Sequence, residues 1–234
     1  MTDWRGAING PLHPLTIRVQ SNRLLALRRR GTLSYYIRPL SVDWFIEREV
    51  FKDRVYGETA GKSDKVVDVG AHIGIASLML AEGGARVIAL EPDPVNYPML
   101  LLNSAMNDLD IEAYRFAVAP RKGRIFLKTE KNTGNSSLIP YSPGGGVWEP
   151  VDAVTLEMFL PCDFLKMDVE GSEYGILEGS EWAKSVRRGM VLEYHKHVPG
   201  WQVHLKHIVD ALEASGFKVK VESHGYNGYL KATK

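Results

Sequence analysis

The stretch Val66-Val67-Asp68-Val69-Gly70-Ala71-His72-Ile73-Gly74 decides the fold of this chain. Its apolar first part predicts a buried strand, and the glycines that follow predict a tight turn into a helix. A second apolar run, Val87-Ile88-Ala89-Leu90, ends at the carboxylate of Glu91. This order places a glycine turn, a helix N-terminus and an acidic strand end on one edge of an α/β sheet. Such sheets hold nucleoside-bearing cofactors at that edge.

The spacing of the turn, Asp-x-Gly-x-x-x-Gly, differs from the Gly-x-Gly-x-x-Gly of most nicotinamide binders. A cofactor without a pyrophosphate needs less bare backbone, and an Asp at the strand end suits a cationic or amine-bearing ligand. S-adenosylmethionine meets both conditions. In this interpretation Gly70 and Gly74 let the backbone approach the methionine moiety. Asp68 holds the amino-acid part directly or through water, or instead caps the following helix.

The remaining cofactor contacts are expected at the ends of the second and third strands. Glu91, which is followed by Pro92, is placed to accept hydrogen bonds from both ribose hydroxyls. Phe116 or Ala117, at the end of the third strand, is expected beside the adenine. His72 lies inside the glycine turn, where a spacer or backbone contact is the favoured interpretation.

Strands and helices alternate from Asp64 onward, which predicts a mostly parallel sheet with right-handed crossovers. The predicted strands are Lys65–Val69, Arg86–Leu90, Glu112–Phe116, Phe164–Met167, Met190–Tyr194 and Phe217–Val221. Near the C-terminus, Val219–Glu222 and Tyr229–Thr233 are separated by a turn sequence, which predicts a hairpin with an antiparallel last strand. Class I methyltransferases, whose fold is Rossmann-like, end in this way.

Two further segments stand apart from the alternating core. Residues 1–62 are predicted to form an N-terminal extension packed on the core, with strands at Leu15–Val19 and Leu33–Ile37 and a helix at Asp43–Tyr56. Residues 63–234 then form the cofactor-binding domain. Residues 120–150 are rich in Gly, Ser, Asn and Pro and are predicted to be an irregular loop, either a functional lid or a surface excursion.

Composition limits the class of protein. The chain has 234 residues, of which 44% are hydrophobic and 24% charged, as expected for one soluble α/β core plus an extension. Its formal net charge of +1 disfavours a nucleic-acid partner. Cys162 is the only cysteine, so an intramolecular disulfide is excluded. With neither a targeting segment nor an apolar run of the ~20 residues that a membrane span needs, a cytoplasmic protein without a membrane partner is expected.

The second half of the chain carries the most specific pattern, Asp168-Val169-Glu170-Gly171-Ser172-Glu173 after an apolar strand. With it, residues 40–200 resemble the FkbM family of S-adenosylmethionine-dependent methyltransferases. The matching pieces are Asp68–Gly74, Ala89–Pro94, Asn103 with Asn107, Ala117–Ala119, Asn135–Ser137, Val154–Glu157, Phe164–Glu173, Leu177–Gly179 and Leu192–His195. Glu157 departs from the Asp usual in the family. The resemblance implies oxygen methylation of a sugar or a secondary-metabolite hydroxyl.

Methyl transfer is an in-line displacement at a sulfonium, in which the cofactor supplies the leaving group. An alcohol acceptor must also lose its proton to a base. The candidates are Asp168, Glu170, Glu193 and His195, at or just past the carboxyl ends of the fourth and fifth strands, where ligands of open α/β sheets collect. His195 has the pKa range of a base near neutral pH. Asp168 or Glu170 would orient it or bind the acceptor's hydroxyls.

Several alternatives stay open at this point. Asp168, Glu193 and His195 could instead hold a divalent cation that lowers the pKa of the acceptor, but this is not favoured because carboxylates at strand ends are also common caps. A zinc site is not expected. Other functions in competition are a nucleotide-dependent dehydrogenase, a noncatalytic cofactor-binding module and a nucleic-acid methyltransferase. The sequence leaves the small-molecule acceptor and the oligomeric state undetermined.

Overall fold

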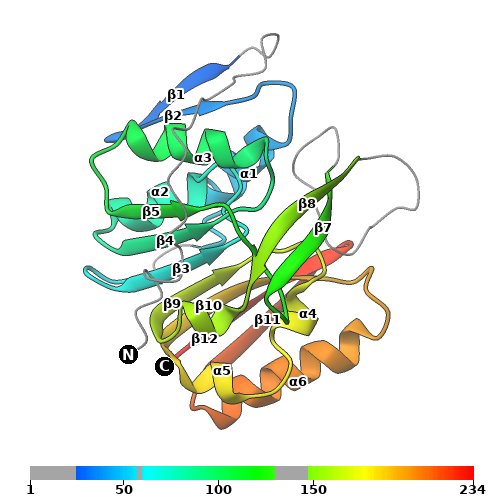
Figure 1. Ribbon diagram of the computed structural model, residues 1–234. Helices are drawn as coiled ribbons and strands as arrows, with labels where there is room; N and C mark the ends of the chain where they lie inside the picture. Colours follow the sequence, from blue (N-terminus) through cyan, green and yellow to red (C-terminus); the bar gives the residue numbers. More distant parts are fainter. Residues whose placement is uncertain (1–24, 57–59, 130–146) are drawn as a thin grey trace.

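A seven-stranded sheet forms the centre of the computed structural model, which describes residues 25–56, 60–129 and 147–234 (Figure 1). The strand order is β11-β12-β10-β9-β3-β4-β5. In chain order the strands are β3 Lys65–Val69, β4 Arg86–Leu90, β5 Ile111–Tyr114, β9 Cys162–Met167, β10 Val186–His195, β11 Lys218–His224 and β12 Asn227–Thr233. The first five pair in parallel, and β12 pairs antiparallel with β10 and β11. The predicted mostly parallel sheet with an antiparallel C-terminal hairpin is therefore confirmed.

The predicted strand bounds agree best with the structure where the run of apolar residues is continuous. The strands β3 and β4 have the predicted bounds, whereas β5 ends at Tyr114, before Phe116. The strand β10 begins at Val186 instead of Met190, because a register shift after Val186 lets it pair further along β9. Arg187 and Arg188 in this part are exposed, so the apolar pattern does not reveal it.

Helices cover both faces of the sheet and make three layers (Figure 1). One face carries α2 Ile75–Glu82 and α3 Asn96–Ala105, and its buried side chains form one apolar cluster with those of α1 Asp43–Phe51. The other face carries the short α4 Glu173–Ile176 and α5 Glu181–Lys184 and the longer α6 Trp201–Ala214. Successive side chains of a strand point to opposite faces of the sheet, so the core has two apolar clusters. In β3, Val66 belongs to the cluster under α1, α2 and α3, and Val67 belongs to the cluster under α4, α5 and α6.

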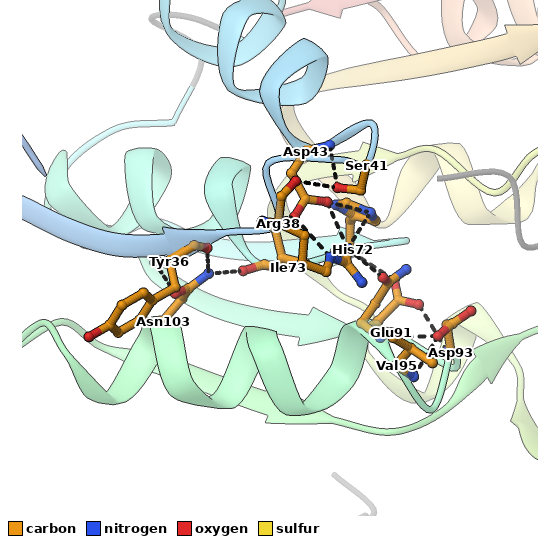
Figure 2. A network of polar contacts seen from close by, with 11 residues as sticks. Tyr36, Arg38, Ser41, Asp43, His72, Ile73, Glu91, Asp93, Val95 and Asn103 are labelled. Atoms are coloured by element: carbon orange, nitrogen blue, oxygen red, sulfur yellow. Dashed lines mark hydrogen bonds and ion pairs between the residues drawn. The ribbon is translucent and has the colours of Figure 1, made fainter. Parts of the chain in front are cut away.

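The N-terminal segment is held by the side chains of α3. The strands β1 Ala26–Arg30 and β2 Leu33–Ile37 form an antiparallel pair. Asn103 accepts a hydrogen bond from the Tyr36 N–H at 2.7 Å and donates to the Tyr36 carbonyl at 3.1 Å. Asn107 makes the same pair of bonds to Ser34. These bonds fasten β2 to the core, as the Tyr36–Asn103 pair in Figure 2 shows.

Two expectations about this segment change. The helix α1 ends at Phe51 and not at Tyr56, because the chain turns at Arg54, which has a positive φ of 47°. The predicted strand Leu15–Val19 lies outside the described residues.

The prediction that residues 120–150 form an irregular loop is wrong at both ends. The strands β7 Gly123–Thr129 and β8 Val147–Val154 pair antiparallel, and β6 Ala117–Val118 joins β8 in a second, three-stranded sheet. Phe126 of β7 and Trp148 of β8 are exposed, so the two strands lack the alternation of apolar and polar residues by which a half-buried strand is recognised. Residues 130–146, which carried the expected lid, lie outside the described residues.

Within the described part of the chain, none of the helices has the length and apolar character needed to cross a membrane.

Candidate functional site

The turn between β3 and α2 has a backbone that requires glycine. Gly70 has φ +75°, and a Cβ there would lie 1.7 Å from the Asp168 carbonyl oxygen. The Gly70 N–H donates to the Leu90 carbonyl at 2.9 Å, and Lys166 Nζ donates to the Gly70 carbonyl at 2.6 Å. Gly74 precedes α2 with φ +88°. The turn is therefore locked against the ends of β4 and β9, with its backbone open on the remaining side.

Glu91 is fixed at the end of β4 by two backbone donors. Its carboxylate accepts the His72 N–H at 2.7 Å and the Asp93 N–H at 2.9 Å. Burial, and then the negative charge of Asp93, raise the pKa of Glu91 to about 7. The orientation of this carboxylate is thus set before any ligand binds.

A cavity of about 620 Å³ opens over these strand ends. Six of the predicted cofactor-binding residues line it, namely Gly70, His72, Glu91, Pro92, Phe116 and Ala117. The mostly apolar lining with a few polar groups is typical of a small-molecule site.

Asp68 and Gly74 do not line this cavity. Asp68 is fully buried, accepts a hydrogen bond from Ser77 Oγ of α2 at 2.6 Å, and pairs with Lys166 Nζ at 3.0 Å. Asp68 thus contacts α2 through Ser77 and does not cap it, since the N-terminus of α2 receives no side-chain hydrogen bond. A contact of Asp68 with the cofactor, directly or through water, stays a prediction.

Arg38, which follows β2, contacts both Asp43 of α1 and His72 of the glycine turn (Figure 2). Its guanidinium donates twice to Asp43, at 2.9 and 2.7 Å, and once to Asn96 Oδ1 at 2.9 Å. Its Nη2 also lies 3.4 Å from His72 Nε2. Asn96 and His72 both line the cavity, and Arg38 is only 4% exposed. Because nothing in the local sequence marks Arg38, sequence reasoning missed this connection.

We expect Arg38→Lys to lower the free energy of unfolding by about 1.5–3 kcal/mol, the range for hydrogen bonds to a charged group. A lysine ammonium keeps the charge but cannot reproduce the planar fork that reaches Asp43 and Asn96 together. Urea unfolding measures the change, and S-adenosylhomocysteine titration should show weaker binding.

The control is Arg48→Lys on α1, which affects the exposed pair Arg48–Asp53. Exposed pairs contribute little, so the expected change is within about 0.5 kcal/mol. Equal effects of the two substitutions would contradict the role given to Arg38.

A second, more open cavity of about 1150 Å³ adjoins the first. The two share Ile46, Asp168 and Glu170 in their linings. All four predicted catalytic residues line the second cavity, since Glu193 and His195 come from the end of β10. The remaining lining residues are Val42, Phe45, Glu49, His197, Tyr226 and Asn227. The structure thus brings the predicted catalytic residues together beside the predicted cofactor site.

His195 is clamped between two carboxylates. Its Nδ1 lies 3.1 Å from Glu173 Oε1, and its Nε2 lies 3.3 Å from Glu170 Oε2. Burial lowers the pKa of His195, but the hydrogen bonds to Glu170 and Glu173 and their charges raise it to about 12. The imidazole is therefore protonated at neutral pH and cannot accept a proton there. The expectation that His195 is the base does not fit this geometry.

Glu173 is the residue that sequence reasoning missed here. It is fully buried and accepts the backbone N–H of Gly171 at 2.9 Å and of His195 at 2.8 Å, in addition to the ring contact. Because the Glu173 carboxylate is itself held by these two backbone N–H groups, it fixes the orientation of the His195 imidazole. The Asp-x-Glu-x-x-Glu spacing contained the signal, but it gave no means of telling which carboxylate faces His195.

The other carboxylates of the second cavity have altered acidity. Burial, and then the charge of Asp168, raise the pKa of Glu193 well above its usual value. Burial also raises the pKa of Glu170, although the hydrogen bond to His195 opposes this. Asn227 Nδ2 donates to Glu193 Oε1. Glu49 of α1, which the sequence analysis did not single out, adds a further carboxylate to the lining.

Comparisons with known proteins identify the family of this chain. The model of the methyltransferase FkbM domain matches residues 68–219. Methyltransferase sdnD of Sordaria araneosa is 28% identical over 231 residues, covering 82% of this chain and 83% of that protein.

Solved structures show the same fold. TYW2 of M. jannaschii, in complex with AdoMet, superposes with a TM-score of 0.51 at 14% identity, over 90% of this chain and 84% of that one. Trm5b of Pyrococcus abyssi superposes with a TM-score of 0.52 at 15% identity, over 90% of this chain and 55% of that one.

The fold and the site define a class I S-adenosylmethionine-dependent methyltransferase with a Rossmann-like core. The chain belongs to the FkbM methyltransferase family, and its cofactor is S-adenosylmethionine. The alternative of a nucleotide-dependent dehydrogenase is therefore wrong, as the missing Gly-x-Gly-x-x-Gly had indicated.

Proposed function

We propose that this methyltransferase acts on a hydroxyl group of a small metabolite, such as a sugar or a secondary-metabolite moiety. The supporting observation is the second cavity, which shares Asp168 and Glu170 with the cofactor cavity and has the buried Glu193 in its wall. An alcohol must lose a proton on methylation, and carboxylates at the junction of the two cavities suit that task.

In this proposal the cofactor lies across the ends of β3, β4 and β9. The methionine part approaches the Gly70 backbone, and the ribose hydroxyls donate to Glu91. The adenine lies toward Phe116 and Ala117. Asp168 and Glu170 are then the groups closest to the transferred methyl, because they line both cavities.

Glu170 is proposed as the proton acceptor. The acceptor hydroxyl gives its proton to the Glu170 carboxylate while its oxygen forms a bond to the methyl carbon. The carbon–sulfur bond breaks, its electron pair goes to sulfur, and the products are a methyl ether and S-adenosylhomocysteine. Holding the two reactants in line supplies roughly 7–11 kcal/mol of the barrier reduction.

The role of Glu91 predicts a pH dependence of cofactor binding. With a pKa of about 7, Glu91 is ionised above pH 7 and protonated below it. Only the ionised form accepts fully from two hydroxyls, so affinity for S-adenosylhomocysteine should fall as the pH drops from 8 to 6. Calorimetric titration over that range measures it.

Glu91→Gln is the matched variant for this measurement. It should bind S-adenosylhomocysteine about 10–100-fold more weakly at pH 8, since hydrogen bonds to a charged group contribute about 1.5–3 kcal/mol. Its affinity should also be nearly constant between pH 6 and 8. Wild-type affinity in the variant would show that the ribose lies elsewhere.

The function itself is tested with methyl-labelled S-adenosylmethionine and a panel of sugars, polyols and phenols, with products analysed by mass spectrometry and NMR. Label on a hydroxyl oxygen supports the proposal. Label on nitrogen or carbon, or on RNA only, contradicts it. Retained S-adenosylhomocysteine binding without transfer to any acceptor would favour a noncatalytic cofactor-binding module.

A further inference from the structure

Three side chains in the wall of the second cavity are arranged as metal ligands. Asp168 at the end of β9, and Glu193 and His195 at the end of β10, place one donor atom each within 4.8 Å of the other two. Adjacent parallel strands put these ends side by side, which fixes the three donors on rigid elements. Glu193 is 7% exposed and His195 6%, so the arrangement is part of the fold and not of a mobile surface.

The ring of His195 is oriented as in many metal sites. Metal-bound histidines usually donate their second ring N–H to a carboxylate, which fixes the ring and its tautomer. Here Glu173 Oε1 lies 3.1 Å from Nδ1 and also accepts the His195 backbone N–H at 2.8 Å. Glu173 is therefore the outer carboxylate, and Nε2 is the nitrogen left to bind a cation. Nε2 lies 3.3 Å from Glu170 Oε2. Binding of a cation would release the proton from Nε2, because only a neutral imidazole coordinates a metal.

Asp168 provides an independent indication of a bound group. Its Oδ1 atom is buried but has no hydrogen-bond partner among the described residues. A buried carboxylate oxygen without a donor is costly, because it has lost water and gained nothing. Asp168 lines both cavities, so a cation beside Oδ1 would lie where acceptor and cofactor meet.

We propose that Asp168, Glu193 and His195 bind one divalent cation in the acceptor cavity, of the Mg²⁺ or Mn²⁺ type. Two carboxylates and one imidazole favour these oxygen-preferring ions, and the described residues include no cysteine near the site that would select a softer one. The cavity leaves room for further ligands from water or from vicinal hydroxyls of the acceptor.

Such a cation would select the acceptor as well as activate it. An oxygen bound to a divalent cation loses its proton more readily, which leaves Glu170 to take it up. Two neighbouring hydroxyls, as in a sugar or a catechol, would chelate the cation and bind more tightly than a single alcohol. This part rests on the proposed function, whereas cation binding itself does not.

The test measures Mn²⁺ binding to the full chain without cofactor or acceptor, by the loss of the free Mn²⁺ signal in electron paramagnetic resonance. We expect one saturable site per chain, with Mg²⁺ as a competitor. Glu193→Gln and Asp168→Asn keep side-chain size and should each weaken Mn²⁺ binding at least about 100-fold, beyond the 10–100-fold typical of outer-sphere changes. Circular dichroism verifies that both variants fold.

Glu49→Gln is the matched control, because it removes one carboxylate from the same cavity wall without touching the three ligands. Its Mn²⁺ affinity should stay within a few-fold of wild type. The proposal is overturned if wild type lacks a saturable site at millimolar Mn²⁺, or if Glu49→Gln weakens binding as much as Glu193→Gln. Methyl transfer that persists in a chelator, with Mn²⁺ binding absent, would overturn the cation site and leave the proposed function standing. Mn²⁺ binding without methyl transfer to any acceptor would support the cation site and contradict the proposed function.

Discussion

Glu170→Gln should lower kcat for methyl transfer by a factor on the order of 10²–10⁴, the contribution typical of a positioned base. Glu170 lies at the junction of the two cavities, and its carboxylate approaches His195 Nε2 at 3.3 Å. Glutamine keeps the shape and a hydrogen-bonding oxygen but cannot accept the acceptor's proton. Steady-state kinetics, with S-adenosylhomocysteine binding measured in parallel, checks the prediction.

The affinity for S-adenosylhomocysteine should change little in Glu170→Gln, since the proposed defect concerns the acceptor side. Glu49→Gln serves again as the control, because Glu49 lines the acceptor cavity but not the cofactor cavity. A kcat that falls equally in both variants would show that the total charge of the cavity matters and not the proton transfer. An unchanged kcat in Glu170→Gln would remove Glu170 as the base.

Gly70→Ala should destabilise the fold by about 4 kcal/mol or more, a loss found only when a substitution meets a specific structural conflict. The new Cβ would lie 1.7 Å from the Asp168 carbonyl oxygen, and backbone cannot rotate away as a side chain does. The turn would have to open, and binding of S-adenosylhomocysteine should be lost with it. Urea unfolding and calorimetric titration measure the two effects.

Gly179→Ala separates this contact from the cost of backbone conformation. Gly179 has φ +82°, close to the +75° of Gly70, but a Cβ there meets nothing within 4 Å. The control should therefore show only the left-handed penalty of about 1–2 kcal/mol. If the two alanine variants were equally stable, the tight approach between the turn and β9 would not exist in solution.

Much of the cofactor site was predictable because it depends on local sequence. The run before Gly70 gave the bounds of β3, and the run before Glu91 gave those of β4, since every residue after the first in each strand is buried and nearly all of these are apolar. Strand ends of a parallel sheet meet at one edge, so the proximity of Gly70 and Glu91 followed from topology. The hairpin of β7 and β8 was missed because its exposed aromatic residues hide the period of a strand.

The residues of the acceptor cavity show where sequence reasoning reaches its limit. The sequence identified Asp168, Glu170, Glu193 and His195 as one group, because each lies at or just past the end of a predicted strand. It assigned His195 an ordinary acidity, since the acidity of an imidazole depends on neighbours that the sequence does not order in space. The contacts of His195 with Glu170 and Glu173 reverse that assignment.

The sequence by itself determined the family and the mostly parallel sheet with its antiparallel hairpin, because glycine turns, strand-end carboxylates and apolar runs are encoded within a few residues. Only the tertiary structure decided that Asp68 turns inward to Lys166 and that Arg38 reaches His72. It also decided which carboxylates surround His195. Charge, burial and ligand geometry arise between segments far apart in the chain, and packing alone brings them together.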